Sequence, residues 1–113
     1  MSSEQTEVPQ AIATYQAAHD RRDVPTALAQ FTDDATVVDD GRTYEGTAGV
    51  ESFLTTAASE YTYTRTLLSA TELAAGHWRI TNRLEGNFPG GRVDLSYEFR
   101  LAGGRISQLA IAP

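Results

Sequence analysis

The sequence predicts an α+β fold, with helices concentrated in the first half of the chain and a mostly antiparallel sheet in the second. Up to about residue 60, apolar residues recur at intervals of three and four, which is the spacing of one helix face. From there to the C-terminus, β-branched and aromatic residues alternate with polar ones between glycine-rich turns. Helices followed by a meander of strands are expected to pack as two layers.

The first helix is predicted from a stripe of apolar and aromatic residues that begins at Val8. Ile12, Tyr15 and His19 follow at spacings of four, three and four, which places all four residues on one helix face. The charged run at 20–23 ends the stripe. Tyr15 is therefore expected to point into the core.

A second, short helix is predicted after Asp23, whose side chain suits the N-cap position. Pro25 falls in the first turn, where its missing N–H costs little. This helix is expected to carry Leu28 and Phe31 inward and to end in the polar residues 32–34.

A small β-hairpin is predicted next, with strands at 35–39 and 42–45. The Asp40–Gly41 pair between them is a strong turn signal. Because side chains alternate between the two faces of a strand, Val37 and Asp39 are expected on the same face.

A third helix is predicted to open at Gly46, with Thr47 as its N-cap. Its apolar face is expected to consist of Val50, Phe53, Leu54 and Ala57. Four strands complete the chain at about 61–73, 77–87, 92–102 and 105–111, and the turns between them contain glycine.

Length and composition indicate one domain. The chain has 113 residues, of which 41% are hydrophobic, enough for a single core. Residues 1–7 are polar and acidic and are predicted to form a disordered tail, so the domain is placed at 8–113. The N-terminus lacks the basic and apolar regions of a signal peptide, which favours a cytoplasmic location.

Charge and residue types exclude several classes of function. The net charge of −6 and the absence of a basic stripe disfavour nucleic acid as a partner. No apolar run is long enough to predict a membrane span. The sequence contains no cysteine, and its two histidines lack metal-ligand spacing, so neither a metal nor another cofactor is expected.

Several segments carry a family resemblance. The segment 15–20, the Phe-Thr-Asp-Asp-Ala-Thr run at 31–36, the Gly-Thr-Ala run at 46–48, and 97–101 followed by Gly103–Gly104 resemble nuclear transport factor 2-like (SnoaL-like) proteins. The resemblance implies a cone-shaped, curved sheet packed on three N-terminal helices around an apolar pocket. By motif, the nearest functional relative is ketosteroid isomerase, which moves a proton between carbon atoms without a cofactor.

Asp39 is the first candidate catalytic residue. If Val37 points into the pocket, Asp39 points there too, and an apolar wall would raise its pKa and make it a better base. The resemblance implies the general base at this position. The alternative is that Asp39, beside the Asp40–Gly41 turn, caps backbone N–H groups.

Two tyrosines are candidate hydrogen-bond donors. Tyr15 lies on the predicted buried stripe, and the resemblance places it where the isomerase donates to the developing oxyanion. The alternative is an ordinary core aromatic. Tyr97 departs from the family pattern, because the isomerase holds a protonated aspartic acid there. Its hydroxyl could also donate, although its ring would shorten the pocket.

Further side chains are expected to contact a ligand because they lie on the apolar faces that meet around the pocket. These candidates are Phe31, Phe53, Trp78, Asn82 and Phe99. Asn82 alternates with apolar residues, so its amide must find partners, either on the ligand or within the protein.

Three functions fit these patterns. The first is an enzyme that transfers a proton next to a carbonyl of a small apolar molecule, as an isomerase, cyclase or dehydratase. The second is a domain that binds such a molecule without catalysis, and the third is a dimerisation module. The resemblance also implies a homodimer that pairs through the outer face of the sheet.

Overall fold

A computed structural model of the chain describes residues 8–113, apart from the side chains of residues 57–60. The tail predicted for residues 1–7 and the inward position predicted for Ala57 lie outside the described residues. The helices and strands are, in order, α1 (Gln10–Asp20), α2 (Val24–Leu28), β1 (Phe31–Asp39), β2 (Arg42–Glu45), α3 (Gly46–Glu60), β3 (Tyr63–Ala74), β4 (His77–Gly86), β5 (Arg92–Ala102) and β6 (Arg105–Ala112).

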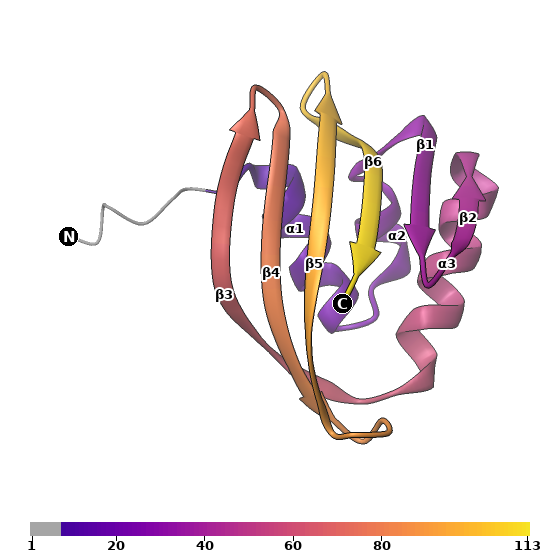
Figure 1. The fold of residues 1–113 in the computed structure, drawn as a ribbon. Coiled ribbons are helices and arrows are strands. Elements are labelled where there is room, and N and C mark those ends of the chain that lie inside the picture. Colours follow the sequence, from indigo (N-terminus) through magenta and orange to yellow (C-terminus); the bar gives the residue numbers. More distant parts are fainter. Residues whose placement is uncertain (1–7) are drawn as a thin grey trace.

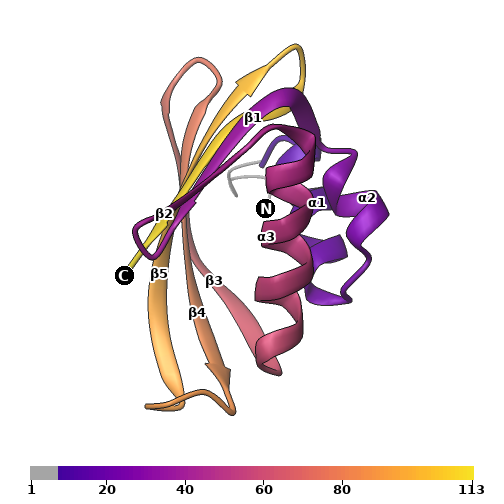
Figure 2. The same ribbon diagram turned by 90° about the vertical axis from the view of Figure 1, so that its right-hand side faces the viewer.

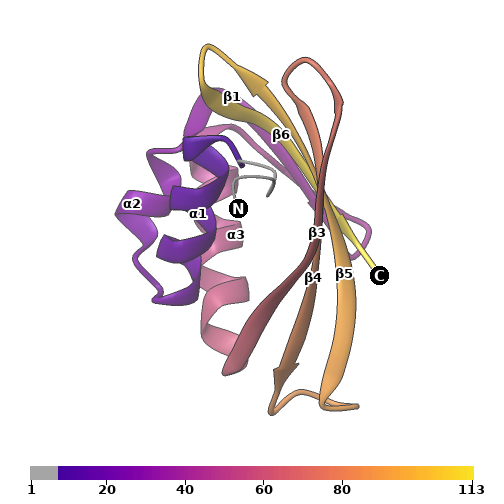
Figure 3. The same ribbon diagram turned by 90° about the vertical axis from the view of Figure 1, so that its left-hand side faces the viewer.

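The helices and the sheet form two layers. All strands of the described chain belong to one six-stranded sheet in the order β2-β1-β6-β5-β4-β3. Neighbouring strands are antiparallel except β1 and β6, which are parallel. The three helices lie on one face of the curved, unclosed sheet, as Figures 2 and 3 show from its two edges (Figure 1 gives the strand order). The predicted α+β fold class is confirmed.

Strand β1 begins earlier than predicted. The second helix was expected to reach Phe31, but α2 ends at Leu28 and Phe31 is the first residue of β1. The reason is pairing with β6: the backbone N–H of Ile106 donates to the carbonyl oxygen of Gln30 at 2.7 Å, and Phe31 pairs with Ile106. Phe31 is still buried, as expected.

Of the two predicted N-cap residues, Asp23 is confirmed and Thr47 is not. The carboxylate of Asp23 accepts a hydrogen bond from the backbone N–H of Thr26 at 3.3 Å, which confirms it as the N-cap of α2. The prediction for Thr47 is wrong, because α3 begins at Gly46 and Glu45 holds its N-cap position without a side-chain bond. Gly46 has a φ of +73°, which turns the chain from β2 directly into the helix.

The core lies between α1 and the sheet, and Tyr15 is near its centre. Its ring meets Phe31 edge-on, with centroids 5.3 Å apart, and Phe99 at 5.9 Å. Ile12, one turn earlier on the same face of α1, is fully buried. The predicted stripe therefore faces the sheet.

Hydrogen bonds join the residue before β3 to the residue after β4. The backbone N–H of Thr62 donates to Asn87 Oδ1 at 3.0 Å, and the N–H of Asn87 donates to the carbonyl oxygen of Thr62 at 3.1 Å. These two segments approach so closely that a Cβ at Gly86 would lie 2.1 Å from the carbonyl oxygen of Thr62. This position requires glycine for steric reasons.

We expect Gly86→Ala to lower the free energy of unfolding by about 3 kcal/mol, because the added methyl group overlaps backbone atoms. Gly103→Ala is the matched control, since its surroundings are open and only its positive φ of +59° is strained; it should cost about 1 kcal/mol. Chemical denaturation of both variants measures the difference. Equal costs would show that the close approach of Thr62 is wrong.

Candidate functional site

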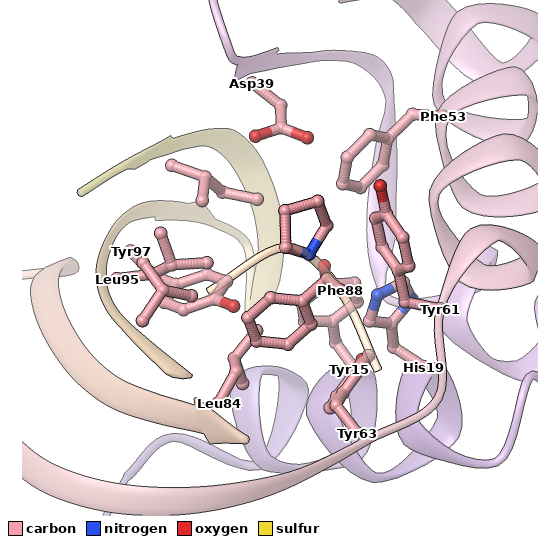
Figure 4. A pocket seen from close by; sticks show the side chains of 13 residues that line it. Tyr15, His19, Asp39, Phe53, Tyr61, Tyr63, Leu84, Phe88, Leu95 and Tyr97 are labelled. Carbon is pink, nitrogen blue, oxygen red and sulfur yellow. The ribbon is translucent and has the colours of Figure 1, made fainter. Parts of the chain in front are cut away.

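A cavity of about 310 Å³ lies between the sheet and the helices. This volume is at the lower end of the range for small-molecule sites. Figure 4 shows the side chains around it. The cavity is lined by Tyr15, His19, Asp39, Phe53, Tyr61, Tyr63, Leu84, Phe88, Pro89, Val93, Leu95, Tyr97 and Ile111.

The cavity walls are mainly apolar and come from most elements of the fold. Strands β4 and β5 supply aliphatic side chains, α1 and α3 supply rings, and the loop after β4 adds Phe88 and Pro89. Phe88 meets Tyr61 edge-on, with centroids 5.8 Å apart. The pocket predicted between helices and sheet is therefore present, and neither Tyr97 nor Trp78 fills it.

Asp39 brings a carboxylate into this apolar cavity. Val37 is fully buried and Asp39 is half-buried on the same side of β1, as the strand period predicts. The carboxylate makes no hydrogen bond or ion pair with any described residue, the backbone of the neighbouring turn included. Burial raises the pKa of Asp39 above its ordinary value, and the adjacent Asp40 adds to this effect.

Four tyrosines line the cavity, and burial changes the pKa of three of them, Tyr15, Tyr63 and Tyr97. The hydroxyl of Tyr15 is buried and has no hydrogen-bond partner among the described residues. Burial raises the pKa of Tyr15 well above its ordinary value, with Tyr97 the next cause. Burial also raises the pKa of Tyr97, and it raises the pKa of Tyr63 to about 12. All three hydroxyls stay protonated near neutral pH and can donate a hydrogen bond.

His19 is a polar lining residue on α1. Its ring stacks on Tyr15 with centroids 5.7 Å apart and on Phe53 with centroids 6.3 Å apart. Burial lowers the pKa of His19, so the neutral imidazole is favoured near neutral pH. The sequence places His19 on the buried stripe, but nothing in its local pattern distinguishes a pocket residue from a core residue.

The structure separates the predicted ligand contacts into two groups. Phe53 lines the cavity, together with the predicted catalytic residues Asp39, Tyr15 and Tyr97. The other predicted contacts are buried in the core and do not line this cavity: Phe31, Trp78, Asn82 and Phe99. The amide nitrogen and oxygen of Asn82 have no hydrogen-bond partner in the described part of the chain.

Sequence reasoning did not select several residues that line the cavity. Leu84, Val93 and Leu95 could have been found, because they share a strand face with predicted inward residues. Tyr61 and Phe88 carry no such signal, because they lie in connections whose course depends on the whole sheet.

Within the part of the chain that the structure describes, no three His, Asp or Glu side chains gather as a metal site would require. None of the helices described there is long and apolar enough to span a membrane.

The chain belongs to the family of SnoaL-like domains, whose family model matches residues 12–109. The expected resemblance is thereby confirmed. A protein from Sinorhizobium meliloti, assigned as a polyketide cyclase, has a similar crystal structure: the TM-score is 0.86 and the identity 27%, over 93% of this chain and 95% of that one. No curated protein matches the sequence.

Two more distant structures share the fold. A Catenulispora acidiphila protein with a ketosteroid isomerase-like fold, solved with trimethylamine, gives a TM-score of 0.82 at 19% identity, over 95% of this chain and 87% of that one. A Mycobacterium tuberculosis protein solved with estradiol-17beta-hemisuccinate gives a TM-score of 0.76 at 19% identity, over 91% of this chain and 90% of that one. At this identity, the likeness shows the fold.

We expect an NMR titration of the Asp39 carboxyl to give a pKa above the ordinary value of 3.8. Asp40→Asn should bring the pKa of Asp39 closer to that value without restoring it, because burial is the larger cause. An ordinary or depressed pKa would contradict a half-buried, unpaired carboxylate.

The same shift predicts a dependence of stability on pH. Because the pKa of Asp39 is higher in the folded chain, ionisation of this group opposes folding. Asp39→Asn should therefore stabilise the fold at pH 7, and this gain should disappear as the pH falls below the unfolded pKa of about 3.9. Thermal melting across this pH range measures the gain in stability. An Asp39→Asn variant that is less stable than wild type at pH 7 would contradict the prediction.

Proposed function

We propose that this chain binds a small, mainly apolar molecule in the cavity and catalyses proton transfer next to its carbonyl group. The observation that carries the proposal is the joint placement of Asp39 and Tyr15 on one apolar cavity. Asp39 offers an unpaired carboxylate with a raised pKa. Tyr15 offers a buried hydroxyl that no described residue satisfies.

The chemistry requires a base and a hydrogen-bond donor at separate places. Asp39 would remove a proton from the carbon next to the carbonyl and later return it to another carbon of the same molecule. In between, negative charge collects on the carbonyl oxygen, and a donor held in an apolar site stabilises that charge. Tyr15 is the main donor in this proposal and Tyr97 the second. The overall reaction is an isomerisation, and no cofactor takes part.

Burial tunes the two groups in the required directions. A raised pKa makes Asp39 a stronger base than an exposed aspartate, although it must still be ionised to act. The high pKa of Tyr15 keeps its proton on the hydroxyl, so this group acts as a donor. The relatives described as a polyketide cyclase and as an estradiol derivative complex support a ligand of this general kind.

The alternative is a domain that binds an apolar molecule without catalysis, since the same walls would serve both functions. The catalytic and binding-only functions differ in their need for Asp39. Passive binding of an apolar molecule gains nothing from an unpaired carboxylate in the cavity wall. Burying such a group costs free energy. This cost favours the catalytic proposal.

The direct test is isomerisation of cyclohex-3-enone to the conjugated cyclohex-2-enone, followed by ultraviolet absorbance. Asp39→Asn should abolish turnover while ketone affinity stays the same or improves, because the side chain keeps its shape and loses its charge. Tyr15→Phe should slow the reaction by roughly 10²-fold, the effect of removing one oxyanion donor.

Asp40→Asn provides the matched control, because the exposed neighbouring carboxylate does not line the cavity. It should retain most of the turnover. If Asp39→Asn turns the ketone over as fast as wild type, Asp39 is not the base. If wild type binds the ketone but does not isomerise it, the binding-only alternative holds.

We also propose a cytoplasmic homodimer that pairs through the outer face of the sheet. Two ion pairs form on this face within one chain: Arg83 contacts Asp94 at 2.8 Å and Arg79 contacts Glu98 at 2.9 Å. A depression beside them includes Val38, which is 37% exposed. A face with paired charges around an apolar spot can bury against its own copy at modest cost.

Light scattering at micromolar concentration should therefore give about twice the chain mass of 12.3 kDa. Val38→Asp should shift the mass toward the monomer, since it places an unpaired charge in the interface. A wild-type mass near 12.3 kDa would contradict the dimer.

A further inference from the structure

The α1 wall of the cavity holds two buried polar atoms that lack partners. The hydroxyl of Tyr15 and Nδ1 of His19 are both buried and accept or donate no hydrogen bond within the described chain. Buried polar groups in proteins are nearly always satisfied, because leaving one unpaired costs about 1–3 kcal/mol. Two such atoms on adjacent turns of a helix that borders a cavity indicate a partner that enters the cavity.

The imidazole of His19 is held in place by its neighbours. It is stacked between Tyr15, at an interplanar angle of 15°, and Phe53, at 9°. These rings come from α1 and α3, so both helices contribute to fixing the plane of the imidazole. Figure 4 shows the ring among the side chains that surround the cavity. A ring fixed in this way can present its nitrogen atoms to a ligand without losing further freedom.

The charges of the residues around the cavity favour an uncharged ligand. Burial favours the uncharged imidazole, which has one donating and one accepting nitrogen. No lysine or arginine is among the residues that line the cavity. A neutral oxygen atom, either a carbonyl or a hydroxyl, satisfies these groups without bringing an unpaired charge into the cavity.

We propose that His19 is a ligand-positioning residue that, together with Tyr15, hydrogen-bonds an oxygen atom on an otherwise apolar ligand. The inference rests on the proposed function only in that the cavity is the ligand site, and it does not require catalysis. Asp39 lies across the cavity from Tyr15 and His19 in Figure 4. The oxygen therefore marks the end of the ligand that is farther from the carboxylate.

The test compares neutral probes that differ in one polar group. 2-Naphthol and 2-methylnaphthalene have the same shape and differ by a hydroxyl, while 2-acetylnaphthalene and 2-isopropylnaphthalene differ by a carbonyl. Calorimetry or competition binding gives the affinity ratio within each pair. Wild type should prefer the oxygen-containing member of at least one pair, and the pair that shows the preference identifies hydroxyl or carbonyl as the recognised group.

His19→Phe keeps an aromatic ring between Tyr15 and Phe53 but removes both nitrogen atoms. It should reduce the preference about three- to tenfold, the effect of one neutral hydrogen bond, and leave the affinity for the hydrocarbon probe unchanged. His77→Phe is the matched control, because this histidine contacts Glu98 on the sheet and does not line the cavity. It should leave the preference at the wild-type value.

A second measurement uses the unmodified chain and does not depend on a variant that folds. In a ¹H–¹⁵N spectrum of the imidazoles, the preferred oxygen-containing probe should shift a ring nitrogen of His19, whereas its hydrocarbon partner should not. Equal affinities within both pairs, or a His19 resonance that responds equally to both members, would overturn the inference and leave apolar binding intact. If no probe binds, the proposed function fails and this inference fails with it.

Discussion

The packing of Tyr15 is the interaction on which both the fold and the site depend. Its ring meets Phe31 and Phe99 edge-on and stacks on His19, so it joins α1 to strands at separate places in the sheet. Large aromatic contacts of this kind contribute strongly to core stability. The same side chain also lines the cavity, and its buried hydroxyl has no hydrogen-bond partner among the described residues. One residue therefore holds the helix layer on the sheet and supplies the polar group that a ligand would meet.

Burial around this residue also sets the chemistry of its neighbours. The removal of water disfavours charge, so it raises the pKa of Asp39 and lowers the pKa of His19. The carboxylate becomes a better base, while the imidazole stays neutral and suits an uncharged oxygen. The two shifts have opposite directions because one group is charged when it loses a proton and the other when it gains one. A single physical cause thus produces both pKa shifts, and under the proposed function it gives the two sides of the cavity distinct roles.

Local patterns predicted the fold and the inward residues of regular elements. The helical stripe placed Tyr15, and the strand period placed Asp39 with Val37, because each pattern depends only on nearby residues. The first residue of β1 could not be predicted, because Phe31 pairs with Ile106, which lies far along the chain. The alternation of residues along the strands predicted which side chains point inward. It did not distinguish those in the core from those that line the cavity. Phe99 and Tyr97 share one face of β5, yet Phe99 is buried in the core against Tyr15 of α1 and Tyr97 lines the cavity.

The central claim is that Asp39 and Tyr15 face one ligand in the same apolar cavity. A crystal structure of the chain with 2-tetralone, a neutral bicyclic ketone, tests it most directly. The ketone should lie among Leu84, Leu95 and Phe53, with its oxygen toward the α1 wall and a carbon next to the carbonyl toward Asp39. A ketone bound on the outer face of the sheet, or a cavity closed by Phe88 with Asp39 turned to solvent, would contradict the account.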